Sequence, residues 1–120
     1  MKILVVDDDK TIRSIVEVIL EDEWEVLLAE SGEEALGIAD AQSPDLIVVD
    51  MHMPEMDGPA TIAKLRENPK FAKTPIVFMT ADEHTADPSY YASLGATGAI
   101  IKPIDPRTLD SKLRAFLSDS

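Results

Sequence analysis

The sequence predicts an α/β fold in which a five-stranded parallel sheet lies between two layers of helices. Short apolar runs rich in Val and Ile recur along the chain, and each is continuous, as in strands that are buried on both faces. Helix signals separate the runs, and the resulting (βα)5 order is typical of a doubly wound, three-layer sheet. The runs are Ile3–Val6, Val26–Ala29, Leu46–Val49, Ile76–Met79 and Ala99–Ile101.

Periodicity and capping signals predict the first two helices. Between Ile12 and Leu20, apolar residues (with Ile15, Val16 and Ile19) recur every three or four positions, which predicts one apolar helix face. Ser31 followed three residues later by Glu34 is a capping-box pattern, and it predicts a second helix that reaches about Ala41.

Prolines near helix starts predict the remaining three helices. Pro59 suits the first turn of a helix that runs to Glu67. Asp87–Pro88 combines a cap with a first-turn proline, and Gly95 suits the end of that short fourth helix. The pair Asp105–Pro106 predicts the start of a fifth helix in the same way.

Length and composition restrict the function. A chain of 120 residues predicts one domain, residues 1–120. Its net charge of −12 opposes contact with nucleic acid and with anionic membranes. No apolar run approaches the ~20 residues that a membrane span needs. The chain has no cysteine, which suits a reducing compartment, so we expect a cytoplasmic domain.

Polar side chains follow all five predicted strands, and those after four of the strands are candidates for one shared site. Asp7–Asp9 come after the first run, Asp50 after the third, Thr80 after the fourth and Lys102 after the fifth. Ligand sites of open α/β sheets form at these carboxyl ends, where the strand order reverses. With the order 2-1-3-4-5 the side chains converge, whereas Glu30 lies at the sheet edge, away from the site.

The convergent residues indicate phosphoryl chemistry. Neighbouring carboxylates repel one another by roughly 4 kcal/mol at an effective dielectric of 20, so they take up protons or bind a hard cation. Oxygen ligands favour Mg²⁺, with Mn²⁺ as a substitute. Together with such an ion, Lys102 and the hydroxyl of Thr80 would stabilise a phosphoryl group on Asp50, since aspartate is a known nucleophile.

Five motifs of the chain resemble, in order and spacing, those of the receiver domain of bacterial two-component response regulators. They are VVDDD, DLIVVDMHMPEMDG, PIVFMTA, the glycines of Gly95–Gly98, and KPI. The resemblance extends over the whole chain and is closest to a single, chemotaxis-regulator-like receiver. It implies a flavodoxin-like fold and a phosphorylation-activated switch that takes its phosphoryl group from a sensor histidine kinase or a histidine phosphotransfer protein.

The resemblance also implies a role for each site residue. Asp50 resembles the phosphoacceptor, Asp8 a direct ligand of Mg²⁺, and Asp7 a ligand that acts mainly through water. The backbone carbonyl of His52 resembles the remaining protein ligand. Thr80 and Lys102 resemble the hydroxyl and the lysine that hold the phosphoryl oxygens, and the Lys102–Pro103 bond resembles one that the family usually holds in cis.

Other functions remain open at this stage. An FMN-binding module would share the topology, but the three aspartates after the first predicted strand would repel the phosphate of FMN. A hydrolase that forms an aspartyl phosphate would need a second catalytic Asp where His52 stands. A module that binds metal without phosphorylation is the third alternative. The output is equally open: it can be a separate protein target or an output domain beyond Ser120.

Some polar residues near the site are expected to have structural roles, and one position departs from the family pattern. Asp9 is expected to cap a helix or to face solvent, and Asp57 to belong to a turn that starts a helix rather than to bind metal. The side chain of His52 is expected to be partly exposed, where it could steer an attacking water. Ala99 occupies a position where receivers commonly carry Tyr or Phe. We therefore expect signalling to depend on reordering of the loop Ala81–Ala86, with Tyr90 or Tyr91 filling the space of the missing ring.

Overall fold

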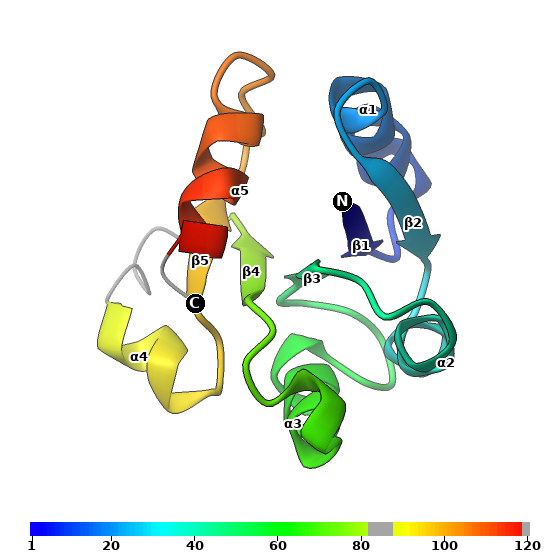
Figure 1. Ribbon diagram of the computed structural model, residues 1–120, viewed down its shortest axis with the longest axis vertical. Coiled ribbons are helices and arrows are strands. Elements are labelled where there is room, and N and C mark those ends of the chain that lie inside the picture. Colours follow the sequence, from blue (N-terminus) through cyan, green and yellow to red (C-terminus); the bar gives the residue numbers. More distant parts are fainter. Residues whose placement is uncertain (82–87, 119–120) are drawn as a thin grey trace.

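A computed structural model describes residues 1–81 and 88–118, and its sheet has the predicted topology (Figure 1). All neighbouring strands are parallel, in the order β2-β1-β3-β4-β5. Each strand is one residue longer than its apolar run, and two of them extend into the site, because Asp50 and Thr80 are the last residues of their strands. The strands are β1 (Lys2–Val6), β2 (Glu25–Ala29), β3 (Leu46–Asp50), β4 (Ile76–Thr80) and β5 (Gly98–Ile101).

The described residues also form five α-helices and one 3₁₀ turn, of which all but α5 lie between strands. They are α1 (Lys10–Leu20), α2 (Gly32–Gln42), α3 (Gly58–Glu67), η1 (Pro69–Phe71), α4 (Pro88–Ser93) and α5 (Leu109–Ser118). The predicted start of the last helix was wrong by three residues. Asp105 does act as a cap, since its carboxylate accepts from the N–H of Arg107 at 2.9 Å, and its carbonyl accepts from the N–H groups of Thr108 and Leu109. The first turn after this cap is not regular α-helix, and α5 begins at Leu109.

Side-chain caps begin the first three helices at the predicted places. Asp9 accepts from the N–H of Thr11 at 2.8 Å, and Asp57 accepts from that of Ala60 at 2.9 Å. Ser31 accepts from the N–H of Glu34 at 3.1 Å. The carboxylate of Glu34 accepts from the N–H of Glu30 at 3.3 Å, one residue before the cap itself. The predicted cap of the fourth helix, Asp87, lies outside the described residues.

Helices cover both faces of the sheet (Figure 1). On one face α2, α3 and α4 pack against strand residues such as Leu4 and Phe78, and on the other α1 and α5 pack against residues such as Val5 and Met79. The predicted apolar face of α1 is confirmed at Val16 and Leu20, but Ile15 is 42% exposed. In the part of the chain that the structure describes, no helix has the length and apolarity needed to cross a membrane.

Candidate functional site

Three carboxylates meet at the carboxyl ends of two neighbouring central strands. Asp7 and Asp8 follow β1, Asp50 ends β3, and these two strands are paired in the sheet. One oxygen from each carboxylate lies within 4.8 Å of the other two. Asp7 is fully buried and Asp50 is nearly so, whereas Asp8 is exposed. The cluster is therefore open to solvent on the side of Asp8.

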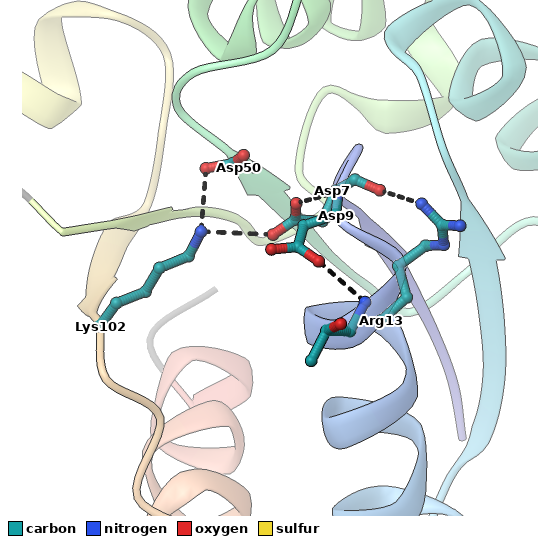
Figure 2. A network of polar contacts seen from close by, with 6 residues as sticks. Asp7, Asp9, Arg13, Asp50 and Lys102 are labelled. Carbon is teal, nitrogen blue, oxygen red and sulfur yellow. Dashed lines mark hydrogen bonds and ion pairs between the residues drawn. The ribbon is translucent and has the colours of Figure 1, made fainter.

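Lys102 lies beside the two buried carboxylates (Figure 2). Its Nζ is 3.4 Å from Oδ2 of Asp7 and 3.4 Å from Oδ1 of Asp50. The backbone N–H of Lys102 donates to the carbonyl of Thr80 at 2.7 Å, so β4 fixes the point from which the lysine extends. The Lys102–Pro103 peptide bond is cis, as the resemblance implied.

The electrostatics of the cluster favour an added positive charge. Burial raises the pKa of Asp50 above its usual value, and the nearby charge of Asp7 raises it further. The ammonium of Lys102 and the backbone N–H of His52 lower this pKa, but they offset the increase incompletely. Oxygen ligands with uncompensated negative charge fit a hard divalent cation such as Mg²⁺.

Thr80 and His52 both lie next to the cluster, but Thr80 is buried and His52 is exposed. Thr80 is buried at the end of β4, one residue past Met79, which pairs with Asp50 in the sheet register. His52 is exposed, as expected, and it contacts Asp50 through its backbone N–H. A contact between its carbonyl and a metal stays a prediction.

Arg13 belongs to the site but escaped the sequence reasoning. From α1, its Nη1 donates to the carbonyl of Asp7 at 2.6 Å (Figure 2). Its Nη2 lies 3.9 Å from Oε2 of Glu30. Glu30 does follow the edge strand β2, yet Arg13 connects it to the acidic loop. The sequence did contain a signal for this contact. Arg13 is a basic residue four positions after the cap Asp9, so it lies one helical turn from the acidic run.

An aromatic side chain from α4 lies near Ala99. In the sheet register Ala99 pairs with Phe78, and the ring of Tyr91 lies 5.8 Å from the ring of Phe78. Tyr91 is buried in the same cluster against which Ala99 packs, whereas Tyr90 is 42% exposed. Of the loop predicted to reorder, residues 82–86 lie outside the described residues, so that hypothesis stays a prediction.

Comparison with known proteins identifies the family. The family profile described as response regulator receiver domain matches residues 3–114. This chain is a member of the response regulator receiver domain family. The match covers both the acidic loop after β1 and the Lys102 turn after β5.

Relatives of this receiver domain include regulators and solved structures. The alkaline phosphatase synthesis transcriptional regulatory protein PhoP of Bacillus subtilis is 37% identical over 120 residues, which are 99% of this chain and 49% of that protein. The response regulator Rre1 of Synechocystis is 34% identical over 98% of this chain and 52% of that protein. The structure of the chemotaxis protein CheY4 from Vibrio cholerae superposes with a TM-score of 0.90 at 34% identity, covering 96% of this chain and 97% of that one.

Family membership defines the general function. The domain takes part in phosphorylation-dependent two-component signalling, and it is a signalling domain rather than a classical enzyme. The chain spans about half the length of PhoP and of several other curated relatives that it matches.

Proposed function

We propose that Asp50 is the residue that accepts the phosphoryl group. The observation that carries the proposal is the position of its carboxylate, which lies at the end of β3 in contact with Lys102 and close to the carboxylates of Asp7 and Asp8. A carboxylate oxygen of Asp50 would attack the phosphorus, and the bond from phosphorus to the donor would break. The charge of the transferred group spreads over three oxygens, which need several positive or hydrogen-bonding partners.

The neighbouring residues would provide those partners. Lys102 would pair with one phosphoryl oxygen, and the hydroxyl of Thr80 would donate to another. Asp7, Asp8, Asp50 and the backbone carbonyl of His52 would hold Mg²⁺, for which Mn²⁺ can substitute. Bound there, the ion would neutralise phosphoryl charge. The same groups would support the slow loss of the phosphoryl group by hydrolysis, so the domain would phosphorylate and dephosphorylate itself.

Membership of the family supports a proposal for the partners. The phosphodonor would be a sensor histidine kinase or a histidine phosphotransfer protein, and the domain would meet it in the cytoplasm. The phosphorylated form would act on a protein target or on an output domain. Because the chain has a net charge of −12, this domain would contact neither nucleic acid nor an anionic membrane directly.

Labelling with a small phosphodonor tests the proposal. Incubated with acetyl phosphate and Mg²⁺, the chain should gain one phosphoryl group that is stable to acid and labile to base, detected by intact-mass spectrometry. Asp50→Asn removes the nucleophilic charge but keeps the shape, so the label should disappear while the fold persists. Asp9→Asn is the matched control, because it changes a nearby aspartate that caps α1, and its label should remain.

The alternatives give different results in the same experiment. A label that persists at full stoichiometry in Asp50→Asn would refute Asp50 as the acceptor. Binding of Mg²⁺ without any label would favour the module that binds metal alone. Yellow absorbance of the purified chain would indicate a flavin module.

A further inference from the structure

Asp7 is fixed at each of its polar groups. Its backbone N–H donates to the carbonyl of Ala29 at 3.1 Å. One carboxylate oxygen accepts from the N–H of Asp9 at 2.8 Å, and the other lies 3.4 Å from Nζ of Lys102. The remaining group is the backbone carbonyl, which accepts from Nη1 of Arg13 at 2.6 Å. Because Asp7 is fully buried, a water molecule could not readily replace Arg13 as the donor to this carbonyl.

Arg13 reaches this carbonyl from the side of the site opposite to Lys102 (Figure 2). Its side chain is only 15% exposed, and its second nitrogen faces Glu30 at 3.9 Å, at the end of β2. The planar guanidinium thus joins the ends of two neighbouring strands, since it has several donors in a fixed geometry.

The two cations of the site contact different parts of Asp7. Lys102 lies against the carboxylates of Asp7 and Asp50, where it competes with any other cation. Arg13 bonds the backbone, and within residues 1–81 and 88–118 its ion pair is with Glu30 rather than with the acidic cluster. Arg13 can therefore hold the loop in place without neutralising the carboxylates that face the cation site.

We propose that Arg13 is a positioning residue of the acidic site, one that orients Asp7 so that the three carboxylates converge on one divalent cation. This inference rests on the proposed function, because it assumes that the cluster binds Mg²⁺. Groups that orient metal ligands typically change metal affinity by 10–100-fold when they are removed. Loss of the Arg13 side chain should therefore weaken Mg²⁺ binding by about tenfold or more.

Titration calorimetry with Mg²⁺ tests the inference on the whole chain. Arg13→Ala should bind Mg²⁺ at least about tenfold more weakly than the unchanged chain. Lys10→Ala is the matched control, since it removes one positive charge from the same helix at an exposed residue, and its affinity should be unchanged. Arg13→Lys, which keeps the charge and one donor, should recover most of the affinity. Glu30→Gln, which leaves the bond to Asp7 intact, should change it less than twofold.

A second measurement needs no metal. In the metal-free chain, amide hydrogen exchange at Asp9 reports the bond from its N–H to the carboxylate of Asp7. Arg13→Ala should accelerate this exchange at least tenfold, whereas exchange in the β4 core should be unchanged. That pattern distinguishes displacement of the loop from general unfolding.

Two results would overturn the inference. One is an Mg²⁺ affinity in Arg13→Ala equal to that of the unchanged chain, and the other is an equal loss in Lys10→Ala, which would reduce the effect to net charge. Failure of the proposed function looks different, because the unchanged chain itself would then bind no Mg²⁺. In that case the role of Arg13 toward the ion is refuted as well.

Discussion

Asp7 and Asp50 are the acidic residues that the described part of the chain buries, although the sequence contains 23 acidic residues in all. Burying a carboxylate costs free energy unless it is paired. Lys102 pairs with both, but a single ammonium cannot neutralise two carboxylates. The remaining negative charge destabilises the metal-free fold. A bound cation would neutralise this charge and so stabilise the fold.

The raised pKa of Asp50 predicts how stability depends on pH. A carboxyl whose pKa is higher in the folded state stabilises the fold while it is protonated, and this contribution is lost as pH rises from 3.8 through the folded pKa. Asp50→Asn, which stays neutral, should therefore raise the melting temperature of the metal-free chain by a few degrees at pH 7. The difference should vanish near pH 3.8. Thermal melts across this range check it, and a lower melting temperature of the variant at pH 7 would contradict it.

Stabilisation by Mg²⁺ should depend on Asp8. An ion that binds the folded state alone adds RT ln(1 + [L]/Kd), which is about 1.4 kcal/mol at tenfold excess over Kd. Millimolar Mg²⁺ should then raise the melting temperature by a few degrees, and Asp8→Ala should abolish most of that rise. Asp9→Asn should keep it, because Asp9 serves α1 as a cap. An equal rise in Asp8→Ala would mean that the ion binds elsewhere.

Among the connections between elements, Arg66 joins α3 to two turns. Its Nε donates to the carbonyl of Gly95 at 3.0 Å, at the turn between α4 and β5 where Gly95 adopts a positive φ of 90°. Its Nη1 donates to the carbonyls of Phe71 and Thr74 at 2.6 and 2.7 Å. Burial lowers the pKa of the guanidinium, yet arginine stays charged in water at any ordinary pH. The three bonds connect α3 to the segment before β4 and to the turn before β5.

Arg66→Ala should therefore destabilise the fold by about 2–3 kcal/mol, since it leaves three carbonyls without their donor. Urea unfolding followed by fluorescence checks this. Trp24 is the single tryptophan, and its indole N–H donates to Asp110 of α5 at 2.7 Å, so it reports global unfolding. Lys64→Ala, an exposed change on the same helix, should cost less than about 0.5 kcal/mol. Equal losses in the two variants would show that the Arg66 bonds contribute little.

At the scale of the whole molecule, charge repulsion acts across the domain. The net charge is −12, and the domain measures 34 × 33 × 30 Å. The Debye length is about 30 Å at 0.01 M salt and about 8 Å at 0.15 M. Repulsion therefore spans the whole molecule at low salt and is confined to neighbours at physiological salt.

Raising NaCl from about 0.01 to 0.15 M should thus raise the melting temperature of the metal-free chain by a few degrees. KCl should have the same effect, because screening depends on ionic strength and not on the identity of the cation. Thermal melts at constant pH check the prediction. Unchanged or lower melting temperatures would mean that local ion pairs outweigh the overall repulsion.

Local sequence signals were sufficient to predict features that depend only on neighbouring residues, such as helix caps. Asp9, Ser31 and Asp57 cap helices as predicted, because a cap depends on the next three residues alone. Local sequence signals were insufficient where tertiary packing decides the burial of a side chain or the exact start of a helix. Ile15 fits the apolar spacing of α1 but is exposed, since burial on a helix depends on what lies across from it. Asp105 has the signal of a helix start and does cap the turn that leads into α5, yet the regular helix begins only at Leu109.

The sequence by itself determined the five strands and the set of polar residues at their carboxyl ends, because continuous apolar runs separated by helix signals allow few alternatives. The order 2-1-3-4-5 came with the resemblance to receiver domains, and the structure confirms it. Tertiary structure alone decided how these residues contact one another. Lys102 lies midway between Asp7 and Asp50, Arg13 bonds the backbone of Asp7, and Tyr91 packs against Phe78. Such contacts join residues from different elements, and their distances depend on how the helices pack on the sheet, which no local pattern records.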